Sequence, residues 1–108
     1  MAKPLQHQII ARALEIISDE AHWTRVVIAR TANGSACCSR DPSAVRFCAI
    51  GALYRAASEL LGDGFEYVFK TAKFVLAANN RGNDSLPRIN DVEGREAVVA
   101  MFNVALAS

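Results

Sequence analysis

The sequence predicts a mainly α-helical, single-domain bundle of four to five helices, with a short β-hairpin around Asn33-Gly34. Three observations predict this class. The chain has 108 residues, of which 52% are hydrophobic and 21% charged, and this suits one domain with one packed core. Apolar residues recur at helical spacing in several segments, and Asn33-Gly34 is a strong two-residue hairpin signal. We therefore expect residues 1–108 to form a single globular helical domain.

The first helix is expected to run from Pro4 to about residues 18–20. Proline suits the first helical turn, because its missing N–H would have no partner there. Gln8, Arg12 and Glu15 lie on the polar side of the projected helix. The apolar side chains share the opposite side, and they are Leu5, Ile9, Ile10, Ala13, Leu14, Ile16 and Ile17.

The segment after the first helix has strand character. Residues 26–28, Val-Val-Ile, are all β-branched, and such side chains favour strands. The Asn33-Gly34 pair that follows is typical of a tight turn between two antiparallel strands. Residues 25–29 could equally extend a helix, so both interpretations remain open for this run.

A second helix is expected from Asp41-Pro42 to about Leu61. Asp41 can cap free backbone N–H groups, Pro42 suits the first helical position, and the glycines at 62 and 64 are a stop signal. At about 100° per residue, the large apolar side chains of residues 46–61 form one wide core face. These are Phe47, Ile50, Leu53, Tyr54, Ala57, Leu60 and Leu61.

Two more helices are expected after this one. The third begins at Phe65 and ends before the turn-forming residues 79–87. Its expected core face consists of Phe65, Val68, Phe69, Ala72, Val75 and Leu76. The last helix is expected over about residues 95–107, with its apolar side formed by Val98, Met101, Phe102, Ala105 and Leu106.

The other side of the second helix carries small side chains. Cys48, Gly51, Ala52 and Arg55 are spaced i, i+3, i+4 and i+7, and they form a shallow notch that leads to Glu59. A glycine inside a helix costs roughly 1 kcal/mol relative to alanine, which indicates that some group uses the missing side chain. Either a neighbouring segment packs into the notch, or the notch is the floor of a pocket with Arg55 as its charged residue.

A polar loop before the last helix is a second candidate for binding. Arg81 and Arg88 lie beside a cluster that includes Asn90 and Asp91. This cluster could bind a small anion or a partner. Alternatively, the Asn and Asp side chains could bond nearby backbone N–H groups and fix the entry to the last helix.

A third candidate consists of two aromatic residues on the third helix. Tyr67 and Phe74 are seven residues apart and lie outside the expected apolar face. Exposed aromatic side chains of this kind commonly mark an interaction surface, although the N-terminal helix could equally cover them. We therefore treat Tyr67 and Phe74 as a candidate protein interface.

The sequence has no catalytic or metal-binding spacing. His7 and His22 are the only histidines, and neither lies at a local spacing that pairs it as a base with Cys48. Cys37 and Cys38 are adjacent rather than spaced C-x-x-C, which does not provide three or four converging metal ligands. We predict no metal and no cofactor, and we regard a non-enzyme as the better description.

Charge and hydropathy restrict the partners. The 12 basic and 11 acidic residues give a net charge of +1, without the basic excess typical of nucleic-acid-binding domains. No apolar run approaches the roughly 18 residues of a membrane span, and the N-terminus has no signal-peptide core. Three cysteines, an odd number, favour reduced thiols and hence a cytoplasmic protein.

The motifs of the chain resemble those of a family of small bacterial and phage proteins known only as a domain of unknown function. The resemblance covers roughly residues 20–106. It rests on a Trp-Thr start, a W-C-x-x-G-A-L helix in which Phe47 replaces the usual tryptophan, and an Asn-Asp pair before the last helix. It implies a bacterial or phage, cytoplasmic origin and supplies no activity or substrate. The matching residues are Trp23, Thr24, Gly34, Asp41, Cys48, Gly51, Ala52, Leu53, Asn90 and Asp91.

Three function classes follow from these observations. The favoured class is a small non-enzymatic protein-binding or inhibitor-like module that acts through a helical surface, on a protein partner or as a homodimer. The first alternative is a small enzyme or ligand-binding protein that uses the Cys48/Gly51/Arg55 notch. The second is a weak nucleic-acid binder, with largely electrostatic affinity, through Arg25, Arg30, Arg40 and Arg46.

Overall fold

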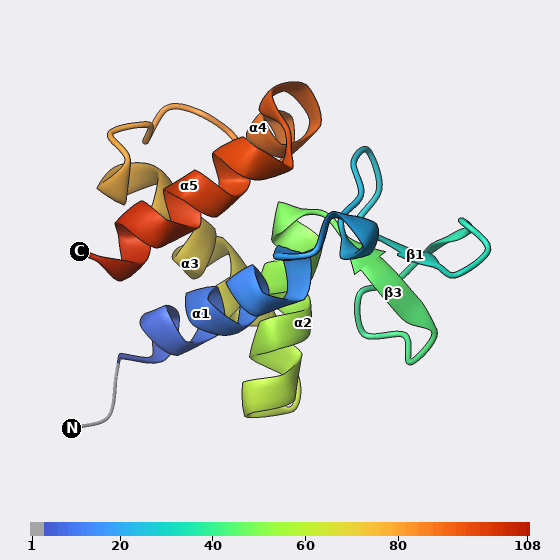
Figure 1. Ribbon diagram of the computed structural model, residues 1–108. Helices are drawn as coiled ribbons and strands as arrows, with labels where there is room; N and C mark the ends of the chain where they lie inside the picture. The colour runs from blue at the N-terminus through green and yellow to red at the C-terminus, as the bar shows by residue number, and fades with distance from the viewer. Residues whose placement is uncertain (1–3) are drawn as a thin grey trace.

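Five α-helices enclose an apolar core, and a small antiparallel sheet extends from one side of them in the computed structural model (Figure 1). The structure describes residues 4–108. The predicted mainly helical fold with a hairpin at Asn33-Gly34 is confirmed. In chain order the elements are α1 (Leu5–Ile17), the 3₁₀ helix η1 (Glu20–His22), β1 (Ala29–Thr31), β2 (Ala36–Cys37), β3 (Ala44–Phe47), α2 (Ala49–Leu61), α3 (Phe65–Ala78), α4 (Leu86–Glu93) and α5 (Arg95–Leu106).

The core lies where α1, α2, α3 and α5 meet. α2 packs against both α1 and α3, and α5 packs against the same two helices. α4 packs against α5, which follows it in the chain, and contacts the start of α2 (Figure 1). Each of the four core helices contributes fully buried large side chains, among them Ile9, Leu53, Val75 and Phe102.

β1 is the central strand of the sheet, with β2 and β3 antiparallel on its two sides. Ala29 lies opposite Phe47, and both are buried against the helices. Neither of the two interpretations left open for residues 25–29 holds over residues 26–28, which form neither strand nor helix, and β1 begins only at Ala29. Val26 has a φ of 77°, in the left-handed region, where the extended backbone of a strand cannot continue.

The predicted start of the second helix at Asp41-Pro42 is also wrong. Residues 44–47 form β3, which pairs with β1, and α2 begins at Ala49. Asp41 caps a turn instead, since its Oδ1 accepts hydrogen bonds from the N–H and hydroxyl of Ser43 (2.9 and 2.7 Å). Pairing with β1 satisfies the backbone groups of this segment, and this tertiary contact outweighs the local helix signals.

α4 lies in a segment that was expected to be a loop. Ser85 is its N-cap, with Oγ accepting a hydrogen bond from the N–H of Arg88 (3.4 Å), and Pro87 lies in the first turn. These are the usual residues of a helix start. Asn90 and Asp91 are therefore helical residues of α4, and Gly94, with a φ of 92°, separates α4 from α5.

α3 presents most of its predicted face to the core, since Val68, Ala72, Val75 and Leu76 are buried, but two predicted core residues are not. Phe65 and Phe69, expected in the core, are 52% and 54% exposed. Tyr67 and Phe74 are half-buried and pack against the core. The Phe74 ring lies 5.5 Å from the ring of His7, so the N-terminal helix covers Phe74. The end of α2 is likewise exposed at Leu60 and Leu61.

Candidate functional site

The notch on α2 is filled by the backbone of Ile28. Gly51 lies so close to the Ile28 carbonyl group that a Cβ at position 51 would overlap its oxygen. The same oxygen accepts a hydrogen bond from the N–H of Cys48 (3.1 Å). Of the two interpretations of the notch, packing by a neighbouring segment is the one that the structure has.

Cys48 is the N-cap of α2. Its Sγ accepts a hydrogen bond from the N–H of Gly51 (3.3 Å), and the residue is 6% exposed. Burial raises the pKa of the Cys48 thiol, which disfavours the thiolate that nucleophilic chemistry needs. Cys48 and the fully buried Ala52 therefore contribute packing and capping at the sheet–helix junction.

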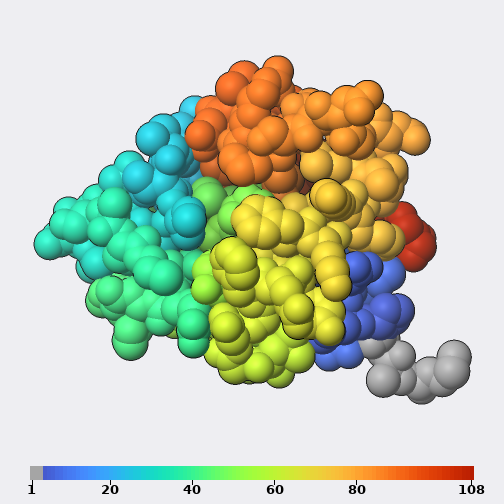
Figure 2. Space-filling model, turned by 180° about the vertical axis from the view of Figure 1, so that it is seen from behind, coloured from blue at the N-terminus to red at the C-terminus, as the bar shows by residue number. Residues whose placement is uncertain are grey.

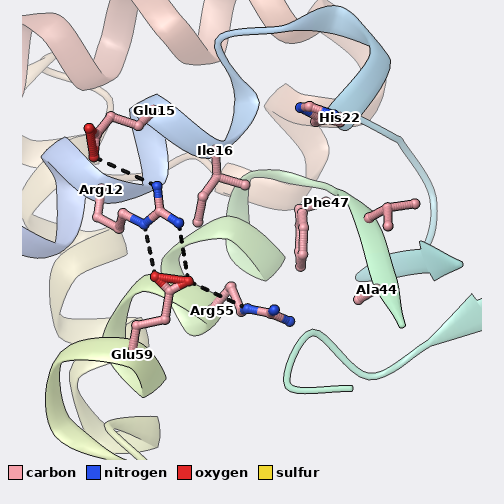
Figure 3. Close-up of a pocket in the computed structure, with 9 residues that line it drawn as sticks. Arg12, Glu15, Ile16, His22, Ala44, Phe47, Arg55 and Glu59 are labelled. Carbon is pink, nitrogen blue, oxygen red and sulfur yellow. Dashed lines mark hydrogen bonds and ion pairs between the residues drawn. The ribbon is translucent and has the colours of Figure 1, made fainter. Parts of the chain in front are cut away.

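Arg55 and Glu59 extend beyond the notch into a charge network that links α2 with α1 (Figure 3). The Arg55 guanidinium donates hydrogen bonds to the carbonyl oxygens of Ser39 (3.0 Å) and Asp41 (3.1 Å). Glu59 accepts a hydrogen bond from Nε of Arg12 (2.8 Å), and this bond lowers the pKa of the Glu59 carboxyl. The two residues tie together α1, α2 and the turn before β3.

An open groove of about 300 Å³ lies beside this network (Figure 3). Its charged groups neutralise one another, since Arg12 pairs with Glu15 and Glu59, and Arg55 with Glu59. His22 lies well apart from Glu59 (Figure 3), so the groove does not assemble a carboxylate–imidazole pair. The lining residues are Arg12, Glu15, Ile16, His22, Ala44, Val45, Phe47, Arg55 and Glu59.

The arginines of the polar loop are paired with carboxylates. Arg81 bonds both Asp84 and Glu93, and Arg88 donates a hydrogen bond to Asp84 (3.2 Å). The hydrogen bond from Arg81 is the main cause of a lowered pKa at Glu93, and the N–H of Ser85 is the main cause at Asp84. This network closes the loop between α3 and α4, and its cations already have anionic partners.

This network has a consequence for acid stability. A depressed carboxyl pKa means that the unfolded chain takes up protons at higher pH than the folded one. The stability that the network contributes is therefore fully present above pH 4.5, the ordinary pKa of a glutamate. It is lost as the pH falls through the pKa of Glu93 in the folded protein. We expect the Tm to fall between pH 5 and pH 3 by less in Glu93→Gln than in the natural protein. Thermal unfolding by circular dichroism measures this. Glu96→Gln, at an exposed site on α5, is the control, and an equal drop in Glu93→Gln and the natural protein would contradict the prediction.

Asn90 lies apart from this network and is fully buried. Its Oδ1 accepts hydrogen bonds from Nε1 of Trp23 (2.8 Å) and the N–H of Ala49 (2.9 Å). Its Nδ2 donates to the carbonyl oxygen of Thr24 (3.1 Å) and to Oδ1 of Asp91 (3.1 Å). One side chain therefore holds together α4, the start of α2 and the segment that precedes the sheet.

Asp91 holds the next residues of that segment. Its Oδ1 accepts a hydrogen bond from the N–H of Val26 (2.8 Å), the residue with a positive φ. Arg25 donates to the Asp91 carbonyl oxygen (3.1 Å), and its guanidinium lies 4.9 Å from the centre of the Trp23 ring. The Asn90-Asp91 pair thus fixes the path of residues 23–26. Both residues lie in helix α4, in a segment that the sequence predicts to be a polar loop.

The arginines of the predicted basic patch are partly engaged within the protein. Arg30 donates to Oγ1 of Thr24 (2.9 Å) and to the Gly34 carbonyl oxygen (2.8 Å). Arg40 donates to the carbonyl oxygen of Gly62 (3.2 Å). Arg46 lies opposite Arg30 in the sheet and is exposed. Of the four, Arg25, Arg30 and Arg40 therefore use donors on their own chain.

An apolar surface is found on α3, where the sequence predicts a core face. Phe65 and Phe69 contact each other edge to face at 5.8 Å, and Phe65 contacts Tyr54 in the same way at 5.7 Å. Beside Phe69 is a groove of about 310 Å³ between α3 and α4, lined mainly by apolar side chains. We call Phe65, Phe69 and this groove the α3 face. The groove residues are Ile50, Phe69, Ala72, Lys73, Leu76, Asp84, Ser85, Leu86 and Pro87.

The α3 face is accessible from outside. Figure 2 shows α3 (yellow) at the centre of one side of the molecule, with α2 (yellow-green) below it and residues 80–93 (orange) above it. The aromatic residues predicted as an interface lie elsewhere on this helix. Phe74 is covered by α1, and Tyr67 is half-buried with Nζ of Lys70 5.4 Å from its ring centre.

Within residues 4–108, no helix is both long and apolar enough to cross a membrane. In the same part of the chain, no three His, Cys, Asp or Glu side chains converge in a way that could hold a metal ion.

A family model described as "Family of unknown function (DUF6197)" matches residues 1–108. The chain belongs to this family. The resemblance read from the motifs is thereby confirmed, and it extends over the whole chain rather than over residues 20–106. No curated protein and no solved structure matches this member of the family.

Six of the residues that carry the resemblance meet at one place in the fold, namely Trp23, Thr24, Cys48, Gly51, Asn90 and Asp91. Trp23 and Thr24 bond to Asn90, and Cys48 and Gly51 pack against the segment that follows them. They therefore hold the sheet on the helices and leave little free surface. Phe65 and Phe69 were not identified as surface residues from the sequence, because a stripe of phenylalanines at helical spacing is more often part of a core.

Proposed function

We propose that this DUF6197 member is a non-enzymatic protein-binding module that binds its partner through the α3 face. The observation that carries the proposal is the exposure of Phe65 and Phe69 beside an apolar groove. Contiguous exposed apolar surface of this kind is typical of interaction sites, and aromatic side chains are enriched in protein interfaces.

The energetics favour a covered α3 face. An aromatic side chain has roughly 200 Å² of surface, so a half-exposed ring leaves roughly 100 Å² in water. Burying apolar surface stabilises by about 25 cal/mol per Å², which gives about 5 kcal/mol for Phe65 and Phe69 together. This gain is available to a partner that places apolar side chains on the two rings, before the costs of association.

The alternative functions have less support. The notch is occupied by the Ile28 backbone, and the Cys48 thiol is buried. The charges of the groove beside Arg55 are paired with one another. Both observations count against an enzyme or small-ligand protein that uses these residues. The engaged donors of Arg25, Arg30 and Arg40 count against a nucleic-acid binder.

The setting in which the module acts is part of the proposal. Cys37, Cys38 and Cys48 are all free thiols, which fits a reducing compartment. Together with the bacterial or phage origin that the motif resemblance implies, this leads us to propose the cytoplasm of a bacterium as the place where the module acts.

Site-specific photo-crosslinking in cells of the source tests the proposal. A benzophenone amino acid replaces Phe69 in one variant and Val104 in the other, since Val104 on α5 is a comparable apolar residue at 45% exposure. We expect discrete protein adducts at position 69, at least about tenfold more abundant than at position 104, because a bound partner excludes water from the α3 face.

The control for specificity is a second substitution. Adding Phe65→Ser to the position-69 variant removes one ring from the interface, and the adducts are expected to decrease while the circular dichroism spectrum stays the same. Equal adduct yields at positions 69 and 104 would refute the α3 face as the binding surface.

A further inference from the structure

We infer that the partner of the α3 face is a second copy of this chain, packed with its α3 antiparallel to the first about a two-fold axis at Phe69. This inference rests on the proposed function, because it names the occupant of the same surface. It is carried by the positions of four residues along and around α3, namely Phe65, Glu66, Phe69 and Lys73.

The positions along the helix are symmetric about Phe69. With a rise of 1.5 Å per residue, Phe65 and Lys73 lie about 6 Å on either side of Phe69 along the helix axis. A two-fold axis perpendicular to the helices at Phe69 places position 65 of one copy at the height of position 73 of the other. The two Phe69 rings then meet at the centre of the interface.

The positions around the helix place Phe65 of one copy at the α3–α4 groove of the other. At about 100° per residue, Ala72 and Leu76 lie within about 20° of Phe65 around the helix, and both line the groove between α3 and α4. When two antiparallel helices pack face to face about this axis, the side that carries Phe65, Ala72 and Leu76 lies on the same side of the interface in both copies. Phe65 of one copy therefore meets the groove of the other, and the same contact repeats in reverse, as an isologous interface requires.

The charges on the other side of Phe69, where Lys73 borders the groove, are complementary in this arrangement. Glu66 and Lys73 lie within about 20° of each other around the helix, and both are exposed. Within residues 4–108 neither forms an ion pair. The two-fold axis places Glu66 of one copy opposite Lys73 of the partner subunit, so two interchain ion pairs flank the central phenylalanines.

A parallel arrangement of the two helices fits these residues less well. A two-fold axis parallel to the helices exchanges the two sides of the face, so Glu66 and Lys73 of one copy would lie across from the apolar Phe65 side of the partner subunit and would lack the opposite charges that the antiparallel pair supplies. It would also leave the groove beside Ala72 without an anchor, since Phe65 would stay at the height of position 65 of the partner subunit, about 10 Å along the axis from Ala72. The observed pattern therefore favours the antiparallel pair.

The mass of the purified full-length chain is the first test. Multi-angle light scattering and sedimentation equilibrium, over a range of concentrations at low salt, are expected to show a species of twice the 11.7 kDa monomer mass. Phe69→Ser is expected to shift this species to the monomer with unchanged circular dichroism. A monomer at every concentration for the natural chain would refute the inference.

A charge exchange tests the antiparallel geometry. Glu66→Lys and Lys73→Glu, made singly, each place like charges across the axis and are expected to weaken dimerisation by about tenfold. The double variant E66K/K73E restores opposite charges and is expected to recover the dimer. Failure of the double variant to recover would refute the pairing of these two residues, even if the chain dimerises.

Cysteines at positions 66 and 73 test the position of the axis and leave Phe69 in place. In a background of Cys37→Ser and Cys38→Ser, which removes the two thiols that are not buried, the variant Glu66→Cys/Lys73→Cys is expected to form interchain disulfides on mild oxidation. Val104→Cys on α5 is the control and should form no interchain disulfide. Equal disulfide formation by the two variants would refute an axis at Phe69.

The two proposals can fail separately. If the isolated chain is a monomer while position 69 still crosslinks to another protein in cells, the module binds a different partner and only the second-copy inference falls. If position 69 gives no adducts beyond those at position 104, the proposed function itself falls.

Discussion

Replacing Asn90 with alanine is expected to lower the free energy of unfolding by roughly 4 kcal/mol. Oδ1 of Asn90 accepts from Nε1 of Trp23 and from the N–H of Ala49, and both donors lose their partner in the variant. An unsatisfied buried polar group costs about 1–3 kcal/mol, and the Thr24 carbonyl oxygen also loses a donor. The loss is a large share of the 5–15 kcal/mol typical of a domain.

Urea unfolding followed by tryptophan fluorescence measures this change, because Trp23 is the single tryptophan and bonds directly to Asn90. The matched control is Asn83→Ala, an exposed asparagine in the loop between α3 and α4, with an expected change below about 0.5 kcal/mol. A loss of less than 1 kcal/mol in Asn90→Ala would contradict the role of Asn90 as a clamp.

Replacing Gly51 with alanine is expected to destabilise the protein by about 3 kcal/mol or more. In an isolated helix the same change would stabilise by about 1 kcal/mol, because alanine is the better helix former. Here the new methyl group would overlap the carbonyl oxygen of Ile28. Because that atom belongs to the backbone, relief requires a shift of the segment before β1, which would also strain the hydrogen bond from Cys48.

The control for this change is Gly82→Ala in the loop after α3. Gly82 has open space around its Cα, and its φ is not positive. Alanine there is expected to leave stability unchanged or raise it by up to about 1 kcal/mol through the entropy of the unfolded chain. The urea midpoints of the two variants are compared with that of the natural protein. If Gly51→Ala were as stable as the natural protein, the notch would have room for a side chain.

The predicted elements were reliable where local signals and tertiary contacts agree. The glycines at 62 and 64 end α2, Asn33-Gly34 turns the hairpin, and α5 covers most of the predicted range. The prediction failed at residues 41–48, where Asp41-Pro42 is typical of a helix start. A strand partner 15 residues earlier in the chain, β1, satisfies the backbone of residues 44–47 instead, and no local pattern reports such a partner.

The site was harder to predict than the fold for a similar reason. The projection of α3 identifies an apolar stripe, but it does not state which part of the stripe the other helices cover. Phe74 is covered because His7 of α1 contacts it, whereas Phe69 is 54% exposed at the edge of the groove between α3 and α4. Exposure depends on neighbours that are distant in sequence, so it was decided by the packing of the bundle.

The sequence by itself determined the fold class, the family and the small-residue notch at Cys48 and Gly51, because these follow from periodicity, turn chemistry and motif spacing. Only the tertiary structure decided what lies in the notch, what Asn90 and Asp91 bond to, and which phenylalanines face water. The physical reason is the sequence separation of the contacts involved. Helical periodicity arises from contacts within a few residues, whereas the Ile28–Gly51, Trp23–Asn90 and His7–Phe74 contacts join segments that meet only when the chain is folded.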